Sequence, residues 1–275
     1  MVNRVRRIAQ TRRVGHLGTL DPLATGVLPL VLGNATRLAK FFQANTKTYD
    51  ALVEFGYSTD TYDCEGAITS AFEEPTFDRA ALEAALNAFR GKFLQTPPPV
   101  SAKKIAGTPA YKLARQSLPV RLKPVEVEVQ LEVLDFSGRL ARFHMRCSAG
   151  AYVRSVAHDV GQALGCGAFV RSLRRVASGE FEISQAYTLD VLREMAQAGK
   201  LGDALIPAAR VLPHFPGTRI DRETEANIRH GKDFRLSPFR PDPEARFVKA
   251  ISEAGDLVAI GEARLPHLYH PVLVL

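Results

Sequence analysis

The sequence of 275 residues contains no tryptophan and only three cysteines. These cysteines, Cys64, Cys147 and Cys166, lie far apart, so no pair has the short spacing of a metal-binding motif. An odd number of cysteines also argues against a disulfide framework, and a reducing cytoplasm is the simplest compartment. Long hydrophobic runs are missing as well, since no apolar stretch approaches the ~18 residues that a membrane-spanning helix needs.

The N-terminal segment lacks the apolar stretch of a secretory signal. Residues 1–13 contain five arginines, which leaves an organellar transit peptide as an alternative. That alternative is less favoured, because a motif that carries chemistry begins directly after this segment. Val2, Val5 and Ile8 recur at helical spacing, so the segment is expected to be a helix with arginines on its other face.

The chain is basic, with a net charge of +7 in an otherwise ordinary composition. Lysine and arginine release counterions from phosphates, so a basic excess favours a nucleic acid as partner. A solvated basic surface without any partner explains the charge equally well. The hydrophobic content of 46% is sufficient for one sizeable core and a small second domain.

Hydrophobic periodicity predicts an α+β fold. Apolar residues at helical spacing predict helices over 2–10, 35–43, 78–93, 109–117, 151–164, 189–198 and 222–230, with Asn34 and either Thr76 or Asp78 as N-caps. Alternation and short apolar runs predict strands over 27–32, 48–57, 125–136, 141–147, 169–176, 245–251, 256–263 and 270–275. The proline-containing segment 200–218 is expected to be a linker or a wrapping loop.

A loop rich in glycine, proline and threonine covers residues 15–26 and presents Asp21. Pro22 fixes its own backbone dihedral and restricts Asp21 to extended geometry. Glycines on both sides allow the backbone to approach a ligand closely. An aspartate before a proline is more often a turn or N-cap residue than a catalytic one, so the loop alone leaves both interpretations open.

Several blocks of residues together resemble the bacterial tRNA pseudouridine-55 synthase family, TruB. The first block, which runs without a gap from Gly15 to Pro29, has the pattern Gly-His-x-Gly-x-Leu-Asp-Pro-x-Ala-x-Gly-x-Leu-Pro. Further blocks follow in the family order at Gly33–Arg37, Lys47–Tyr49, Gly56–Gly66, Gln95–Arg115, Cys147–Ser155, Leu164–Ala168 and Leu173–Arg175. The matches span about residues 2–185, and their combination is highly specific.

The resemblance implies a mixed, largely antiparallel sheet flanked by helices, followed by a small β-rich extension of PUA-like type. It implies a catalytic domain over 1–200, lacking an N-terminal segment, and an RNA-binding domain over 201–275. The implied activity is the isomerisation of a flipped-out uridine at position 55 of the tRNA T-loop. The implied enzyme is a cytoplasmic monomer that needs no metal, nucleotide or other cofactor, and its partner is the T-arm of tRNA.

The resemblance also implies the roles of individual residues. Asp21 matches the catalytic nucleophile, Arg154 its guanidinium partner and Tyr49 the tyrosine that stacks on the flipped uracil. The residues implied in substrate binding are His16, Lys47, Asp60, Tyr152 and Leu173. The residues that we expect to contact the RNA backbone are Arg37, Lys103, Lys104, Arg171, Arg174 and Arg175. Each of the second and third sets also has an ordinary structural or surface interpretation.

The chain departs from the family pattern at its start. Family members begin with a strand that carries an Asp-Lys-Pro-x-Gly-x-x-Ser segment, which this sequence does not contain. We therefore expect either an upstream start codon or a truncated protein, and we favour the former. The alternatives to a synthase are a non-catalytic tRNA-binding or folding protein and, less favoured, a hydrolase with an aspartate nucleophile.

Overall fold

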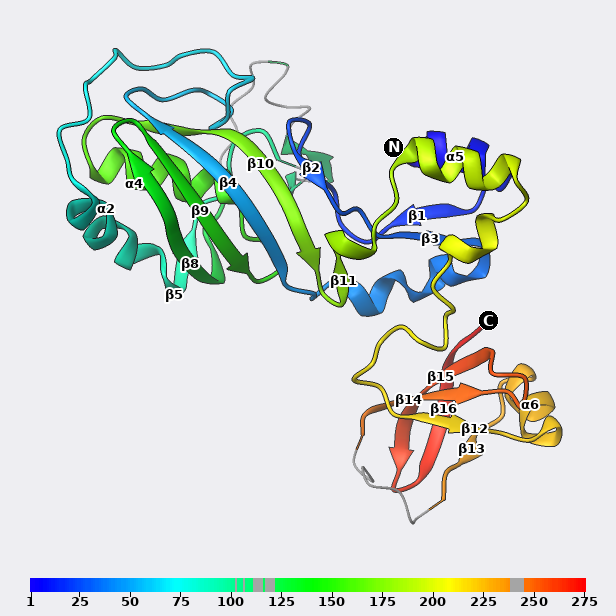
Figure 1. The fold of residues 1–275 in the computed structure, drawn as a ribbon. Coiled ribbons are helices and arrows are strands. Elements are labelled where there is room, and N and C mark those ends of the chain that lie inside the picture. Colours follow the sequence, from blue (N-terminus) through cyan, green and yellow to red (C-terminus); the bar gives the residue numbers. More distant parts are fainter. Residues whose placement is uncertain (102, 106, 111–115, 117–121, 238–244) are drawn as a thin grey trace. The chain divides into compact units, whose positions relative to one another are not determined.

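The computed structural model describes all residues except 102, 106, 111–115, 117–121 and 238–244, and it divides into two compact units (Figure 1). Unit 1 consists of Met1–Leu17, Leu30–Phe42 and Tyr187–Leu275. Unit 2 consists of Gly18–Pro29 and Gln43–Ala186. Within the described residues, no helix is both long and apolar enough to span a membrane.

Unit 2 is built on a seven-stranded sheet. The strands are β2 (Thr25–Gly26), β4 (Lys47–Phe55), β5 (Gly91–Gln95), β8 (Val125–Ser137), β9 (Leu140–Cys147), β10 (Ala168–Ser178) and β11 (Phe181–Glu182). Six of them follow the order β11-β10-β4-β9-β8-β5 with antiparallel neighbours, and β2 pairs in parallel with β10. A two-stranded hairpin, β6 (Lys104–Ile105) and β7 (Thr108–Pro109), lies outside this sheet. The predicted α+β class with a mixed, largely antiparallel sheet is confirmed.

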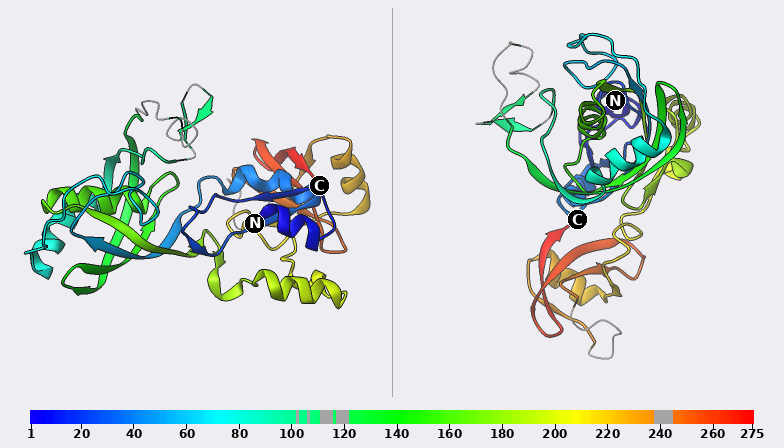
Figure 2. Two further views of the ribbon diagram at one scale, coloured as in Figure 1. Left: turned by 90° about the horizontal axis from the view of Figure 1, so that it is seen from above. Right: turned by 90° about the vertical axis from the view of Figure 1, so that its left-hand side faces the viewer.

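The core of unit 2 lies between this sheet and helices α2 (Arg79–Leu86) and α4 (Val153–Ala163), as Figure 2 shows from two directions. Period-two alternation turns one face of β8 and β9 inward, and helical spacing turns Val156 and Val160 of α4 toward it. Fully burying one such side chain contributes about 1.5–3 kcal/mol. The sheet and α4 therefore form a stiff support for the residues at their ends.

The helix predicted over 78–93 is shorter than expected. Asp78 caps α2 by accepting a hydrogen bond from the Ala81 amide, as one of the two predicted caps. The chain then forms the 3-10 helix η2 (Asn87–Phe89) and enters β5, which pairs with β8. The backbone is already extended at Arg90, where the helical geometry ends, and tertiary pairing overrides the helical spacing beyond it.

Unit 1 combines the N-terminal elements with the C-terminal third of the chain. Its N-terminal elements are α1 (Val2–Ile8), β1 (Val14–His16), β3 (Leu30–Leu32) and the 3-10 helix η1 (Gly33–Phe42). Its later elements are α5 (Leu189–Gln197), η4 (Leu201–Ala204), β12 (Gly217–Arg219), α6 (Arg222–Arg229), β13 (Phe234–Arg235), β14 (Phe247–Ile251), β15 (Leu257–Leu265) and β16 (Leu268–Val274). The last five strands form a second sheet in the order β12-β14-β15-β16-β13.

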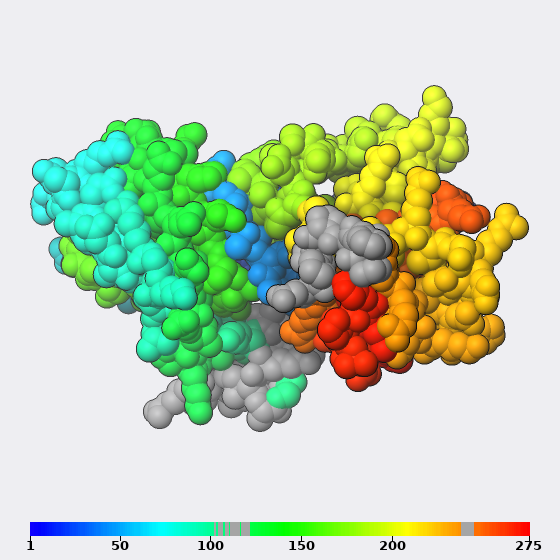
Figure 3. All heavy atoms as spheres, turned by 90° about the horizontal axis from the view of Figure 1, so that it is seen from below, coloured from blue at the N-terminus to red at the C-terminus, as the bar shows by residue number. Residues whose placement is uncertain are grey.

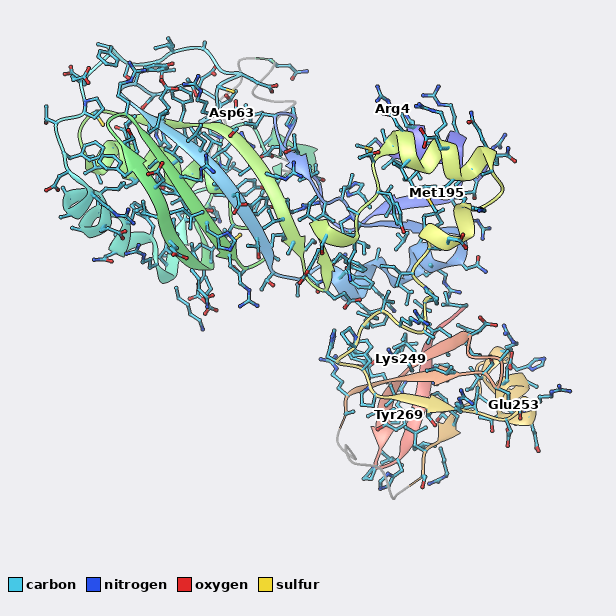
Figure 4. The ribbon with its side chains drawn as sticks, viewed as in Figure 1. Arg4, Asp63, Met195, Lys249, Glu253 and Tyr269 are labelled. Carbon is cyan, nitrogen blue, oxygen red and sulfur yellow. The ribbon has the colours of Figure 1, made fainter. Side chains whose placement is uncertain are left out.

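The second sheet has a core of its own around Ile228, Val258 and Tyr269. Lys249 on β14 is buried between Val248 and Ala250 of this core in the chain, and its ammonium group donates hydrogen bonds to the carbonyls of Ala209 and Val211 (Figure 4). These bonds satisfy a buried charge that would otherwise be costly. The three predicted C-terminal strands are confirmed by β14, β15 and β16.

Two predictions in unit 1 are corrected, and one elsewhere lies outside the described residues. The predicted α-helix over 35–43 is the 3-10 helix η1, which begins at Gly33, so Asn34 lies inside it and is not its N-cap. The Asn34 side-chain oxygen accepts from Arg13 at 2.9 Å. The strand predicted over 27–32 is reduced to partly exposed Leu30–Leu32, since Pro29 has no amide hydrogen to donate. Most of the predicted helix over 109–117 lies outside the described residues.

Candidate active site

The loop that carries Asp21 is fixed to the central sheet by backbone contacts. After a turn closed by the Ala24 amide and the Asp21 carbonyl, β2 pairs with β10. Gly26 has a φ of +99°, and a Cβ atom there would lie 2.1 Å from the Arg175 carbonyl oxygen. Only glycine allows this approach, so the conformation of the loop depends directly on its sequence.

Arg175 holds the same loop through its side chain. The residue is only 1% exposed, and its guanidinium donates to the carbonyls of Val27 at 2.8 Å, Gly18 at 3.1 Å and Thr19 at 3.2 Å. These acceptors lie on both sides of Asp21 in the chain. Buried and bonded in this way, Arg175 has little capacity for the phosphate contact expected from the sequence, and its geometry is that of a positioning residue.

Asp21 and Arg154 form a two-point ion pair. Arg154 Nε donates to Asp21 Oδ2 at 2.8 Å, and Nη2 donates to Oδ1 at 3.0 Å. The arginine side chain is 3% exposed, whereas the aspartate is partly open to solvent. A guanidinium bonded to both oxygens fixes the plane of the carboxylate. Asp21 is therefore held in a fixed orientation with an accessible side.

Asp63 supplies a second carboxylate to the same guanidinium. Its Oδ2 lies 3.4 Å from Arg154 Nη1, inside unit 2 (Figure 4). Hydrogen bonds from the Thr61 hydroxyl at 2.6 Å and the Glu65 amide at 3.1 Å fix its Oδ1. Arg154 also donates to the Thr61 and Val100 carbonyls. This buried partner was not among the residues selected from the sequence, although it lies in one of the matched blocks.

Asp60 occupies the turn that presents Asp63. Its Oδ1 accepts a hydrogen bond from the Ala67 amide at 2.9 Å. A Cβ atom on Gly66 would lie 2.5 Å from that oxygen and 2.3 Å from the Thr61 hydroxyl oxygen, so the turn requires glycine. Asp60 therefore stabilises the turn that carries Asp63 through this hydrogen bond to the backbone.

The start of α4, which carries Arg154, is fixed by the segment after β5. The buried Gln95 amide accepts from the Tyr152 amide at 2.8 Å and donates to the Tyr152 carbonyl at 3.0 Å. The Ser155 hydroxyl donates to the Thr96 carbonyl at 2.8 Å. Gln95, like Asp63, was not selected from the sequence as a site residue. Hydrophobic periodicity does not reveal a buried side-chain amide that binds the backbone.

Two tyrosines lie close enough to Asp21 for its charge to affect them. The pKa of Tyr49 is raised to about 12, mainly by burial, with smaller rises from Cys147 and then Asp21, while the charge of Arg175 and a hydrogen bond with it act in the opposite direction. Burial and then the charge of Asp21 also raise the pKa of Tyr152. Both phenols are therefore protonated at neutral pH and can donate hydrogen bonds beside the carboxylate.

Lys47 and Leu173 border the same loop. The Lys47 ammonium donates to the Asn45 carbonyl at 2.6 Å, and burial lowers its pKa. A Cβ atom on Gly18 would lie 3.7 Å from Lys47 Cε. Leu173 is buried in the core of unit 2, and its carbonyl accepts from the Thr25 hydroxyl at 3.5 Å. The structure therefore groups Asp21, Arg154, Tyr49, Tyr152, Lys47 and Leu173 within unit 2.

The remaining predicted residues are placed elsewhere. Arg171 on β10 is 54% exposed and pairs with Glu54, and Arg174 is exposed on the same strand. Lys103 precedes β6 and Lys104 lies in it. His16, at the end of β1, and Arg37, which donates to the Val274 carbonyl, belong to unit 1. Among the described residues, no group of three histidines, cysteines or acidic residues is arranged to hold a metal ion.

Comparisons with known proteins agree with this arrangement. Residues 6–153 match the family model for the N-terminal domain of TruB family pseudouridylate synthases. Residues 154–212 match the model for the C-terminal domain of tRNA pseudouridylate synthase B. The two models therefore cover the Asp21 loop, the turn with Asp63, and α4 with Arg154.

Individual relatives extend the similarity over the whole chain. The tRNA pseudouridine synthase B of Solibacter usitatus is 55% identical over 276 aligned residues, covering 100% of this chain and 94% of that protein. That of Aquifex aeolicus is 39% identical, covering 96% and 90%. The crystal structure of an archaeal box H/ACA Nop10-Cbf5 complex matches with a TM-score of 0.71 at 23% identity, covering 99% of this chain and 80% of that one, which shows a shared fold.

Proposed function

The chain belongs to the TruB family of pseudouridylate synthases, and on this premise we propose that it converts the uridine at position 55 of the tRNA T-loop to pseudouridine. Isomerisation of uridine in tRNA is the activity of its named relatives, and the chain is an isomerase of this kind. A non-catalytic tRNA-binding role is not favoured, because the synthase similarity covers the full chain.

The observation that carries the mechanism is the two-point bond between Arg154 and Asp21. It supports Asp21 as the nucleophile, because the guanidinium fixes the orientation of the carboxylate while one side of it stays accessible. Attack at uracil C6 or at ribose C1′ both suit this arrangement. The remaining open side of Asp21 is the side from which a base would enter.

The reaction needs only bond exchange and proton transfer. The bond from N1 to C1′ breaks, uracil rotates, and a bond from C5 to C1′ forms. N1 gains a proton and C5 loses one, so the reaction is redox-neutral. We assign the protonated phenol of Tyr49 to stacking on uracil and to hydrogen bonding there, with Tyr152 and Leu173 as further pocket residues.

The base must leave its stack before it can reach Asp21, so the proposal includes base flipping. The favoured substrate is the T-arm, whose loop has unpaired bases that are less costly to extrude. Lys47 near the loop, and the exposed Arg171 and Arg174 on β10, are proposed contacts to the RNA. Lys103, Lys104, Arg37 and His16 remain proposed contacts on the basis of family resemblance.

We further propose that residues 201–275 form an RNA-binding domain that follows a catalytic domain over 1–200. The separate core of the second sheet supports independent folding. Exposed cations such as Arg219, Arg235 and Arg264 support contact with phosphates. We also propose that the enzyme acts as a monomer in the cytoplasm, which light scattering and cell fractionation would test.

The test uses a tRNA transcript labelled with tritium at uracil C5. Wild-type protein should release tritium, because C5 loses its hydrogen, whereas Asp21→Asn should release about a thousandfold less. Asp50→Asn, at an exposed position paired with His144, should retain normal release. Release that persists when position 55 is cytidine would contradict the assigned target. Binding without release by wild-type protein would support the non-catalytic alternative.

A further inference from the structure

Tyr62 has an unusual backbone conformation in the turn beside the site. Its φ is +63°, in the left-handed region that aromatic residues rarely adopt. The residues on either side supply acceptors to Arg154, through the Thr61 carbonyl at 2.8 Å and the Asp63 carboxylate at 3.4 Å. A strained residue between two such contacts suggests that the surroundings hold the turn in a specific geometry.

The ring of Tyr62 stacks face to face on His158. The ring centroids are 3.8 Å apart and the planes differ by 9°. His158 lies on α4, four residues after Arg154, so the two side chains lie on the same face of the helix. The turn is therefore held to α4 at two places, by the polar contacts of Arg154 and by this stack.

The environment of His158 favours a role in stacking. Its Nδ1 is buried and has no hydrogen-bond partner among the described residues. Burial lowers the pKa of His158, so the imidazole is neutral at neutral pH. Nδ1 of His158 makes no polar contact within the described part of the chain, and the face of its ring packs on the phenol ring of Tyr62. The contribution of His158 is therefore the stacking contact itself.

We propose that Tyr62 and His158 are positioning residues that keep the Thr61–Asp63 turn in place against Arg154, and through it orient Asp21. The Tyr62 backbone contributes to the same turn, because its amide donates to the Thr59 carbonyl and its carbonyl accepts from the Val170 amide on β10. Loss of the stack releases the side-chain contact while these two backbone bonds remain. The turn can then shift by fractions of an ångström, which weakens the alignment of Asp21.

The inference rests on the proposed function, since its readout is turnover. The experiment compares Tyr62→Gly and His158→Ala with the stack-preserving variants Tyr62→Phe and His158→Phe, in steady-state tritium release at varied tRNA concentration. We expect the first two to lower kcat about tenfold with KM changed less than about twofold, as expected for lost orientation. The two phenylalanine variants should remain within about twofold of wild type.

Tyr62→Gly separates orientation from stability. Glycine adopts a positive φ without strain, so this relief should offset the lost stack and keep the unfolding temperature near the wild-type value despite the lower kcat. His267→Gly is the matched control, because His267 has a φ of +60° in the turn between β15 and β16 of unit 1. It should relieve the same strain and leave kcat unchanged.

Three results would overturn the inference. One is unchanged kcat in both Tyr62→Gly and His158→Ala. Another is a loss of kcat that parallels a loss of thermal stability, which would indicate a merely structural stack. The third is a rise in KM at constant kcat, which would indicate that Tyr62 binds RNA directly. Inactive wild-type protein would instead contradict the proposed function, so the two failures are distinguishable.

Discussion

The two units of the molecule use arginine in opposite ways. In unit 2, Arg154 and Arg175 are almost fully buried, and each makes at least three hydrogen bonds of fixed geometry. In unit 1, Arg222 is 93% exposed and lies 3.7 Å from Glu253, and Arg246 pairs with Glu262 on an exposed surface. Exposed pairs of this kind contribute only about 0–1 kcal/mol.

This difference separates arginines that act through the geometry of their hydrogen bonds from arginines that act through their charge. A buried guanidinium orients its partners, so a change in its geometry affects chemistry. An exposed guanidinium contributes mainly its charge, so its removal affects long-range attraction to a polyanion. Figure 3 shows the segment from the end of β4 into α2 (cyan) at the surface of the molecule. Ile68 and Phe72 in this segment are exposed. In unit 2, the two buried arginines therefore act through geometry, Arg154 on Asp21 itself and Arg175 on the loop that carries it.

The largest effect is expected for Arg154→Lys. Lysine retains the charge but cannot bond both oxygens of Asp21 and also the Thr61 and Val100 carbonyls. We expect kcat to fall about a hundredfold, which corresponds to about 2.7 kcal/mol of lost transition-state stabilisation. Steady-state tritium release at saturating tRNA measures kcat.

The control is Arg171→Lys, at an exposed arginine on β10. This variant should retain activity within about threefold, since a surface contact depends mainly on charge. Equal losses in both variants would contradict the distinction between oriented and merely charged arginines.

The structure around Asp21 and Arg154 could be predicted only in part from the sequence. Clean alternation predicted β8 and β9, and helical spacing predicted α4, because each element buries one regular face. Asp21 and Arg154 were selected through the family resemblance, and the model brings them together. Periodicity alone could not have paired residues that are 133 positions apart.

The features that the sequence did not predict depend on tertiary contacts. The two-residue strand β2 is too short to have a period, so its parallel pairing with β10 and the burial of Arg175 were not visible. Asp63 and Asp60 stand in the same acidic block, and only the folded turn distinguishes the residue that meets Arg154. The 3-10 geometry of η1 is likewise a result of local packing, because its apolar spacing also suits an α-helix.

The next largest effect is expected for Arg175→Met. Methionine fills a similar space but leaves the carbonyls of Gly18, Thr19 and Val27 without their donor. An unsatisfied buried acceptor costs about 1–3 kcal/mol, and relaxation of the loop should reduce the total to about 3 kcal/mol. We expect the free energy of unfolding, measured in urea, to fall by this amount. We also expect kcat to fall about tenfold, because the loop that carries Asp21 loses three hydrogen bonds.

Arg171→Met on the same strand is the matched control for this change. Its guanidinium is exposed and pairs with Glu54, so stability should change by less than about 1 kcal/mol. A normal kcat in Arg175→Met, measured where the variant is fully folded, would show that the loop does not need this arginine.

A smaller effect is expected when exposed charge is removed from unit 1. Arg235→Gln combined with Arg264→Gln should raise KM for tRNA a few-fold and leave kcat unchanged. If both side chains contact phosphates, the slope of log binding constant against log salt should decrease by up to about 2. Filter binding at several salt concentrations measures this slope.

The control for this prediction removes two charges from unit 2. Arg142→Gln with Arg146→Gln changes two exposed residues on β9, on the face opposite the core. An equal decrease in slope for the two double variants would show a nonspecific effect of net charge, which is not the contact proposed for residues 201–275.

The smallest effect concerns Asp159, which follows His158 on α4. Burial raises the pKa of Asp159 to about 6. Between about pH 4 and pH 6 the folded protein therefore holds a proton that the unfolded chain has released, so stability falls as pH rises through this range. Because the residue is only partly buried, solvent screening limits the effect to about 1 kcal/mol.

Asp159→Asn should remove this dependence, and the variant should be more stable than wild type at pH 7.5 but not at pH 4. Urea unfolding followed by circular dichroism at both values measures the change. Asp190→Asn, on the exposed surface of α5, is the control and should keep the wild-type difference between the two pH values. If Asp159→Asn behaves like this control, the carboxylate is solvated in solution.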